Sequence, residues 1–383
     1  MAKVLLGDVV DRVKDKVDKD ATDLEYYVGG EHIDGDEIMV HRKGLIQGST
    51  IGPAFHMRFQ RGDVLLMSRN PHLRKAGMVD FDGICSDVSY ICRTKDNDVL
   101  LQSLLPFILQ TPEFWQFAEE NKKGGLPFFL NWKDFARFEF ELQTIERQRQ
   151  IADLLWAMER VKIAYRELIA RTDDLVKSQF IEMFGTAADN SRGYPVGTIS
   201  DVVCDVHYGT SRKASDDGDY AYLRMNNITY GGELDLADVK RISVPPKELE
   251  GCLVKKGDVL FNRTNSRELV GKTCSFMLDE PMVIAGYIIR LRMNGKVHPE
   301  YLSTFLNLDS SKKMLMAMSK GAVGQANINA KEVQAIEIVI PPIDVQQQFC
   351  QLVHQTDKSK FAAQQALKEV TDAQKALMKK IFE

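Results

Sequence analysis

The sequence predicts an α/β protein: two tandem, pseudo-symmetric lobes of mixed α+β structure, separated by two long antiparallel coiled-coil helices. Three observations predict this class. The second half of the chain repeats the first. Each half ends in about 40 residues with heptad spacing of its apolar or small side chains. Each half also begins with a region that mixes short β-like runs with amphipathic helical stretches.

The internal repeat consists of four short segments that recur in the same order, displaced by 193 to 198 residues. They are residues 6–10 and 199–203, 61–65 and 256–260, 130–134 and 328–332, and 148–151 and 346–349. Because the displacement drifts by only a few residues across half the chain, chance is a poor explanation. Two related halves joined in tandem are therefore predicted.

The two predicted helices carry complementary heptad seams. The first seam is Ile151, Leu154, Met158, Val161, Tyr165, Leu168, Thr172 and Leu175, and the second is Phe349, Leu352, Thr356, Ser359, Ala363, Ala366, Val370 and Ala373. A seam of small residues suits a bulky partner better than a copy of itself, so we expect the two helices to pack on each other. An open alternative is that each helix docks on its own lobe.

The predicted boundaries follow from the repeat and the caps. Residues 1–143 form the first lobe, 144–185 the first spacer helix, 186–343 the second lobe and 344–383 the C-terminal spacer helix. Thr144 is a suitable cap for the first helix, and Asp344 with Gln347 has capping-box spacing at the second. Residues 63–67, 258–261 and 333–340 read as β-like runs, and residues 100–121 and 299–318 as helical stretches.

Composition describes a soluble globular protein that we expect in the cytoplasm. The net charge is −4, no apolar run approaches the roughly 20 residues of a membrane span, and residues 1–10 do not form a signal peptide because Asp8 interrupts them. The six cysteines form no Cys-x-x-Cys pair, which favours reduced thiols. The seven histidines are scattered without acidic partners at ligand spacing, so no metal site is expected.

Two partial motifs argue against catalysis. The segment Gly271-Lys272-Thr273 is the end of a phosphate-binding loop, but Ser266 stands where the first glycine is required. Residues 70–73 resemble the Asn-Pro-Pro-aromatic motif of amino-methyltransferases but lack the second proline and the aromatic residue. We therefore expect no catalytic residue and no enzyme activity in this chain.

Basic residues are concentrated in one segment of each half, and these two segments overlap when the halves are aligned. Residues 41–75 carry a net charge of +6 and residues 255–272 a net charge of +3. Arg suits guanine edges, Asn and Gln suit adenine, and Lys, Ser and Thr suit phosphate. The predicted DNA-binding residues are therefore Arg69, Arg74, Lys75, Lys122, Lys123, Trp132 and Lys133 in the first half, and Asn262, Arg263, Asn265, Arg267, Lys320, Gln325 and Asn327 in the second.

These segments resemble the DNA-specificity subunit of type I restriction-modification systems. The resemblance is carried by residues 209–211, 222–228, 256–265, 268–272, 324–328, 340–342 and 346–348. The first half matches in residues 62–65, at Asn131 and from Gln148 onward, and departs elsewhere. Through the Gly-Thr loop and residues 222–228, the resemblance adds Thr210, Ser211, Arg212, Lys213 and Asn227 to the predicted DNA-binding residues.

The resemblance implies a non-catalytic subunit with two target-recognition domains, each reading one half of a split asymmetric site in double-stranded DNA. The paired helices would fix the spacing between half-sites and dock two modification methyltransferase subunits, with restriction/translocase subunits joining later. S-adenosylmethionine, ATP and Mg would bind those partners, with no cofactor in this chain. Shortening the first helix by one heptad is then expected to change the tolerated spacer between half-sites.

Three other functions stay open or are argued against. The chain could be a coiled-coil assembly or adaptor protein whose lobes bind protein, or a specificity factor of a related DNA-defence system. A free-standing DNA-modifying enzyme is disfavoured by the incomplete motifs. The near-neutral net charge indicates that partners supply much of the phosphate contact.

Overall fold

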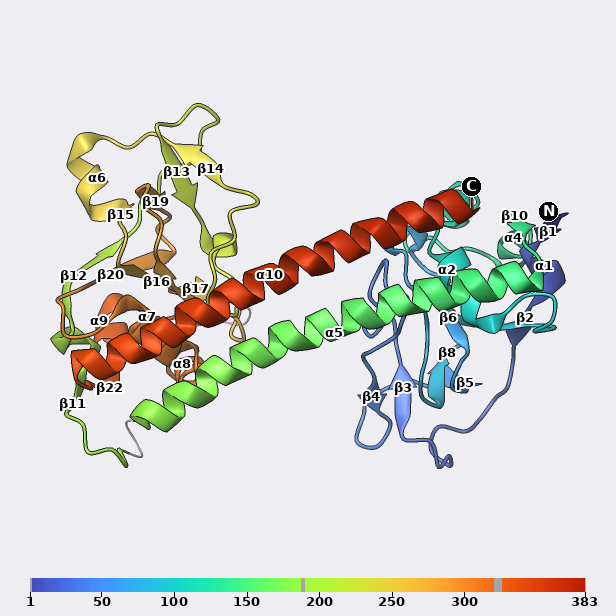
Figure 1. The fold of residues 1–383 in the computed structure, drawn as a ribbon, viewed down its shortest axis with the longest axis horizontal. Helices are drawn as coiled ribbons and strands as arrows, with labels where there is room; N and C mark the ends of the chain where they lie inside the picture. The colour runs from blue at the N-terminus through green and yellow to red at the C-terminus, as the bar shows by residue number, and fades with distance from the viewer. Residues whose placement is uncertain (1, 187–189, 320–325, 383) are drawn as a thin grey trace. The chain divides into compact units, whose positions relative to one another are not determined.

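The computed structural model describes residues 2–186, 190–319 and 326–382, which form two compact units (Figure 1). Unit 1 comprises Met1–Arg166 and Gln365–Glu383, and unit 2 comprises Glu167–Gln364. Each unit therefore contains one lobe together with part of each long helix. The predicted division into two lobes and two spacer helices stays a prediction, because the two compact units each include part of both long helices.

Unit 1 contains two four-stranded sheets and one two-stranded ladder. The strand orders are β2-β9-β6-β7, β4-β3-β8-β5 and β1-β10. The strands are β1 (Ala2–Leu5), β2 (Val10–Val13), β3 (Tyr26–Val28), β4 (Gly44–Leu45), β5 (Phe55–Phe59), β6 (Val64–Met67), β7 (Ala76–Met78), β8 (Gly83–Ser86), β9 (Ser89–Thr94) and β10 (Glu139–Leu142). Its short helices are α1 (Leu6–Val9), η1 (Pro71–Leu73), η2 (Gln102–Leu104), α2 (Leu105–Leu109), α3 (Pro112–Glu120) and α4 (Trp132–Phe135).

Unit 2 repeats this topology. Its corresponding strand orders are β12-β20-β16-β18, β14-β13-β19-β15 and β11-β22, with an additional ladder β17-β21. The strands are β11 (Val196–Thr198), β12 (Val203–Tyr208), β13 (Tyr220–Leu223), β14 (Lys240–Ile242), β15 (Leu253–Val254), β16 (Asp258–Asn262), β17 (Thr264–Asn265), β18 (Thr273–Phe276), β19 (Met282–Ile284), β20 (Ile288–Met293), β21 (Ala326–Asn327) and β22 (Glu337–Val339). Its short helices are η3 (Ile199–Asp201), η4 (Met225–Asn227), α6 (Pro246–Cys252), α7 (Pro299–Asn307), α8 (Asp309–Met318) and α9 (Ala330–Gln334).

The central strand of each lobe is buried on both faces. In β6, Leu65 belongs to the core between the two sheets, whereas Val64 and Leu66 belong to the core shared with the helices. In β16, Leu260 belongs to the core between the two sheets of unit 2, and its neighbours Val259 and Phe261 belong to the core shared with the helices. This is the period-2 alternation of a strand covered on both sides, and it explains why both runs read as continuously apolar.

The repeated Gly-Asp-Val-Leu segment has the same structural role in both lobes. Asp63 accepts two hydrogen bonds from the Arg93 guanidinium at 2.8 and 2.9 Å, and Asp258 accepts two from Arg292, both at 2.8 Å. The glycine before each aspartate has a positive φ, +88° at residue 62 and +93° at residue 257. Glycine adopts this conformation without steric cost, so the motif is a turn whose buried aspartate pairs with a half-exposed arginine.

The long helices are α5 (Ile145–Phe184) and α10 (Ile343–Phe382). In unit 1, Gln374 of α10 contacts Glu159 and Lys162 of α5. In unit 2, Phe349 of α10 packs on Phe180, with ring centroids 5.5 Å apart. Early residues of one helix meet late residues of the other in both units, so the predicted antiparallel packing is confirmed.

The predicted seam is wrong in detail, and the packed face of α5 lies one residue further along. Leu154 and Leu168 are 50% and 47% exposed, whereas Leu155 is fully buried. Residues 152, 155, 159 and 162 keep the heptad spacing, but two of them are Glu159 and Lys162. The apolar heptad pattern follows residues 151, 154, 158 and 161 because the buried positions 159 and 162 carry charged side chains.

The remaining predicted seam residues divide in the same way. The buried ones are Ile151, Phe349, Thr356 and Ala363, and the half-buried ones are Met158, Tyr165, Thr172, Leu352, Ala366 and Val370. The exposed ones are Val161, Leu175, Ser359 and Ala373. All six cysteines are free thiols, and Cys204 alone among them is exposed. No helix in the described part of the chain is long and apolar enough to cross a membrane.

Candidate nucleic-acid interface

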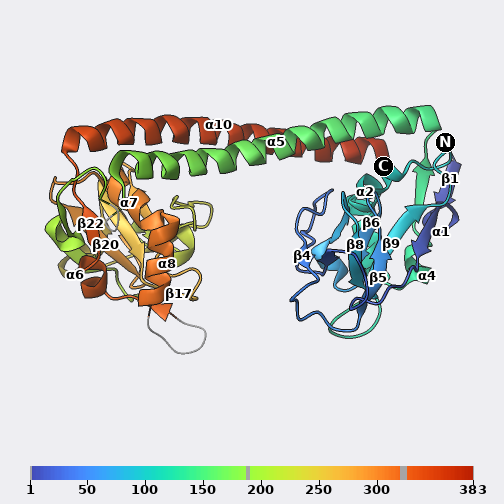
Figure 2. The same cartoon turned by 90° about the horizontal axis from the view of Figure 1, so that it is seen from below.

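Three loops of unit 2 are held together by backbone hydrogen bonds at β17 and β21. Thr264 pairs with Asn327 across this short ladder. The Ile328 N–H donates to the Arg263 carbonyl, and the Arg263 N–H donates to the Tyr287 carbonyl, both at 2.9 Å. Residues 262–266, 285–287 and 326–328 are therefore neighbours. Figure 2 shows β17 at the end of this unit remote from its α5 and α10 segments.

The predicted Gly-Thr loop joins the same cluster. The Thr210 N–H donates to the Ile284 carbonyl at 2.9 Å, and its own carbonyl accepts from the Gly286 N–H at 2.8 Å. A β-carbon on Gly209 would lie 2.2 Å from the Ile284 carbonyl oxygen, so only glycine permits this approach. The Gly-Thr motif thus attaches the loop after β12 to residues 284–286.

Arg263 is the predicted residue whose side chain is best placed for recognition. Its guanidinium carbon lies 4.9 Å from the centroid of the Tyr208 ring. Its Nε is buried and makes no hydrogen bond to any described residue. A guanidinium oriented by an aromatic face retains donors for a base edge.

Two exposed tyrosines beside this cluster were missed by the sequence analysis. Tyr208 and Tyr287 both lie at the surface, and each stands next to a glycine in a loop. Aromatic rings supply stacking surfaces for bases and contacts to sugars. The available signal was a tyrosine adjacent to glycine in an otherwise polar loop.

Three predicted contacts in unit 2 are corrected by burial. Asn227 is 1% exposed, and its amide donates to the carbonyls of Asp235 and Asp238. Asn262 is fully buried, and its amide is oriented to donate to the carbonyls of Thr264 and Tyr287. Thr210 is also buried, and its hydroxyl accepts from the Arg212 N–H at 3.2 Å. Their hydrogen-bonding groups stabilise the loops.

The other predicted residues of unit 2 differ in environment. Arg212 makes a two-pronged ion pair with Glu248 at 2.7 and 2.9 Å, and this hydrogen bonding lowers the pKa of the Glu248 carboxyl. Ser211, Lys213 and Arg267 are exposed, and Asn265 and Asn327 are half-buried. Lys320 and Gln325 lie outside the described residues.

Unit 1 carries a corresponding junction. The Leu130 N–H donates to the Ser68 carbonyl at 2.8 Å, which matches the bond between Ile328 and Arg263 in unit 2. Arg69 and Lys123 both form β-bridges with Phe129, so both are held beside the same strand segment. Lys122 lies 4.7 Å from the centroid of the Phe128 ring and 2.6 Å from a Glu119 carboxylate oxygen.

The remaining predicted residues of unit 1 lie away from this junction or within the core. Arg74 pairs with Asp36 at 3.4 Å, and the Lys75 ammonium donates to the Gly30 carbonyl. Trp132 is a correction: its ring stacks on Phe135 with centroids 4.6 Å apart and packs against the core. Lys133 is exposed on α4. The exposed apolar side chains Leu126 and Phe129 in this loop were missed.

Comparison with known proteins identifies the class of this fold. Residues 193–371 match the model of the type I restriction modification DNA specificity domain. Two solved chains align over almost the whole sequence. The S subunit of a type I restriction-modification system from M. genitalium has a TM-score of 0.58 and 14% identity, and covers 100% of this chain and 96% of its own. A chain from a study of complex assembly and conformational transition of the type I R-M system has a TM-score of 0.54 and 21% identity, and covers 99% and 96%.

Two curated relatives agree with this assignment. The putative type I restriction enzyme MjaX specificity subunit of Methanocaldococcus jannaschii is 24% identical over 193 residues. The type I restriction enzyme EcoKI specificity subunit of Escherichia coli K12 is 25% identical over 190 residues. The matches span 49% and 47% of this chain but only 45% and 40% of the relatives. Together the comparisons show that this chain is similar to type I restriction-modification specificity subunits, the family that its sequence motifs resemble.

Proposed function

We propose that this chain reads a bipartite, asymmetric sequence in double-stranded DNA, one half-site with each lobe. The observation that carries the proposal is the duplicated loop junction, which holds Arg263 and Asn327 in unit 2 and Arg69 and Lys123 in unit 1. The scaffold hydrogen bonds correspond while the side chains differ. Equivalent positions with different residues suit two different half-site sequences.

The side chains at the unit 2 junction suggest a division of roles. Arg263 is the candidate for a guanine edge, and Asn265 and Asn327 are candidates for adenine. The exposed Lys213 and Arg267 suit phosphate contacts, which position the protein without reading sequence. In unit 1, the corresponding reading falls to Arg69, Lys122 and Lys123, with Arg74, Lys75 and Lys133 toward phosphate.

We further propose that the chain is a non-catalytic subunit that docks two modification methyltransferase subunits, with restriction/translocase subunits joining later. An apolar groove of about 410 Å³ between α5 and α10 in unit 1 supports docking on the helices. It is lined by Ala157, Met158, Val161, Glu369, Val370 and Ala373. S-adenosylmethionine, ATP and Mg would be bound by those partners.

The decisive experiment is to map methylated sites in cells that carry the complete system with and without this chain. The proposal expects a split motif with a fixed spacer that disappears with the chain. Arg263→Ala is expected to relax one position of one half-site, by about 1–3 kcal/mol per lost bidentate contact. Lys213→Ala, the matched control, is expected to weaken all sites uniformly. A protein-binding adaptor would leave the methylation pattern unchanged.

A further inference from the structure

A cluster of metal-binding side chains lies in unit 2, away from the loop junction. One ligand atom each from His298, Glu300 and Cys350 lie within 4.8 Å of one another. Glu300 is 7% exposed and Cys350 is 5% exposed. The imidazole Nε2 of His354 lies 2.9 Å from a Glu300 carboxylate oxygen. An imidazole, a carboxylate and a thiol thus meet at one place, with a second imidazole beside the carboxylate, and their scattered positions in the sequence conceal this.

The cluster residues come from two segments, the start of α7 and the first turns of α10. Gln346, Cys350 and His354 recur every four residues and so share one face of α10. The Gln346 side-chain oxygen accepts a hydrogen bond from the His298 N–H at 2.9 Å, which attaches the start of α7 to this face. Glu300 and Cys350 therefore stand on two helices, and His298 stands directly before α7, where its backbone is held by the buried Gln346 amide.

The first half of the chain shows that the fold does not require this cluster. There, Gln148 accepts from the Leu101 N–H at 3.0 Å, as Gln346 does from His298. The positions that correspond to Cys350 and His354 are Ala152 and Trp156, and the Trp156 indole donates to the Ser103 carbonyl at 2.8 Å. Ala152 and Trp156 thus fill the equivalent helix junction in unit 1 without a thiol or an imidazole. The presence of Cys350 and His354 in unit 2 therefore needs an explanation other than the fold.

We propose that His298, Glu300 and Cys350 form a binding site for a divalent transition-metal ion, with zinc as the best fit, a solvent molecule as the fourth ligand and His354 beside the Glu300 carboxylate. Zinc accepts nitrogen, oxygen and sulfur ligands in tetrahedral arrangement, whereas magnesium and calcium prefer oxygen alone. On binding, the Cys350 thiol loses its proton to solvent and the thiolate sulfur bonds to the ion. The two positive charges of the ion then neutralise the buried carboxylate and thiolate.

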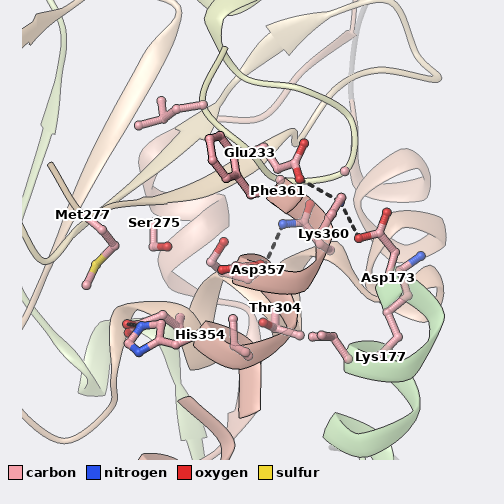
Figure 3. A pocket seen from close by; sticks show the side chains of 18 of the residues that line it. Asp173, Lys177, Glu233, Ser275, Met277, Thr304, His354, Asp357, Lys360 and Phe361 are labelled. Atoms are coloured by element: carbon pink, nitrogen blue, oxygen red, sulfur yellow. Dashed lines mark hydrogen bonds and ion pairs between the residues drawn. The ribbon is translucent and has the colours of Figure 1, made fainter. Parts of the chain in front are cut away.

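Access from solvent is provided by an adjoining cavity of about 510 Å³, which Glu300 and His354 line. Figure 3 shows His354 on the wall of this cavity, on the same helix as Asp357 and Lys360. An ion entering from this side would meet His354 and Glu300 first. The buried Cys350 would complete the site from the helix side.

The test is a titration of the purified, chelator-treated full chain with Co²⁺, which reports thiolate ligation by a ligand-to-metal absorption band. We expect one equivalent to bind with this band, and Cys350→Ala to abolish the band. That variant copies Ala152 of the first half and is expected to fold. Cys252→Ala, which removes another buried thiol, is the matched control and should retain the band. A wild-type chain without the band, or a Cys350→Ala variant that keeps it, overturns the proposal.

Thermal unfolding supplies a second measurement that does not depend on absorption. Zn²⁺ should raise the Tm of the wild type and of Cys252→Ala, because an ion that binds the native state stabilises it. It should leave the Tm of Cys350→Ala and His298→Ala unchanged. If Zn²⁺ shifts all four proteins equally, or none, the cluster is a Glu300–His354 ion pair beside a buried thiol.

Discussion

The contact between α5 and α10 in unit 1 includes three buried polar side chains. The Lys162 ammonium donates to the Glu159 carboxylate at 2.7 Å and to the Gln374 side-chain oxygen at 2.9 Å. The Gln374 amide donates in turn to the Leu155 carbonyl at 3.2 Å. All three side chains are almost completely buried. The buried Lys162 and Glu159 charges stabilise each other, because neither is solvated by water.

Lys162→Met is therefore expected to lower the free energy of unfolding by about 3–5 kcal/mol, because it leaves the Glu159 carboxylate buried and unpaired. Chemical denaturation of the full chain measures the change. The control is the double variant Glu159→Leu/Lys162→Met, which removes both charges and should recover much of the loss. A single variant that costs less than about 1 kcal/mol would show that the Glu159 side chain does not depend on Lys162 for its stability in the native state.

Single residues of the candidate interface were predicted unevenly from the sequence. Arg263 was predicted because arginine in a repeated basic segment indicates recognition, and its contact with DNA stays a prediction. Asn227 and Asn262 were wrong because the same amide groups that suit adenine also suit buried backbone carbonyls. Residue type alone does not distinguish these uses, and exposure depends on pairings such as that between Thr264 and Asn327, 63 residues apart.

The beginnings of the long helices are fixed by a pair of equivalent glutamines. The Gln148 amide donates to the carbonyls of Val99 and Gln143, and the Gln346 amide to those of Lys296 and Pro341. Both glutamines are buried. Gln148 ties α5 to the segment that precedes η2 and α2, and Gln346 ties α10 to the segment that precedes α7, which explains why a glutamine recurs in the repeat.

Gln346→Ala is expected to lower the free energy of unfolding by about 1–3 kcal/mol, because the His298 N–H and two carbonyls lose their partner in a buried site. Gln347→Ala is the matched control, since Gln347 is exposed one residue away and should change stability by less than about 0.5 kcal/mol. Denaturant titration distinguishes the two. Equal effects of both substitutions would show that the amide contacts contribute nothing beyond helix propensity.

Elements were predicted better than their packing. The helix α5 begins at Ile145, directly after the predicted cap Thr144. The helix α10 begins at Ile343, directly after the Pro341-Pro342 pair, so the predicted cap Asp344 lies within its first turn and that cap is wrong. The run at residues 333–340 was taken as β-like but divides into the end of α9 and β22. Helix and strand signals are local, whereas the face of α5 that packs is decided by residues distant in the sequence, in the lobe and in α10. That is why the predicted seam missed by one residue.

At the scale of the whole molecule, duplication explains most of what the sequence could predict. Unit 1 and unit 2 share strand order in three ladders, including the parallel pairs β3–β8 and β13–β19. The residues that preserve this topology, such as Asp63 and Asp258, recur in the sequence because both halves need them. The residues that distinguish the lobes do not recur, so their roles depended on the structure.

The proposed function gives α5 and α10 a role that can be tested by changing their length. Both helices contribute residues to both units, with the division after residue 166 in α5 and after residue 364 in α10. Inserting seven residues at each of these points adds about two helical turns, or roughly 10 Å, to each helix. A seven-residue insertion preserves the heptad register on both helices.

With partner subunits present, this double insertion is expected to lengthen the tolerated spacer between half-sites by about three base pairs, since one DNA turn of 10–10.5 base pairs spans about 34–36 Å. The half-site sequences themselves should stay the same, because the loop junctions at Arg263 and Arg69 are unaltered. Selection of bound sites from a random DNA library measures both quantities. Insertion into α5 alone is the control, and it should impair binding at every spacer because it shifts α5 against α10. An unchanged spacer with the double insertion would show that the helices do not set the distance between half-sites.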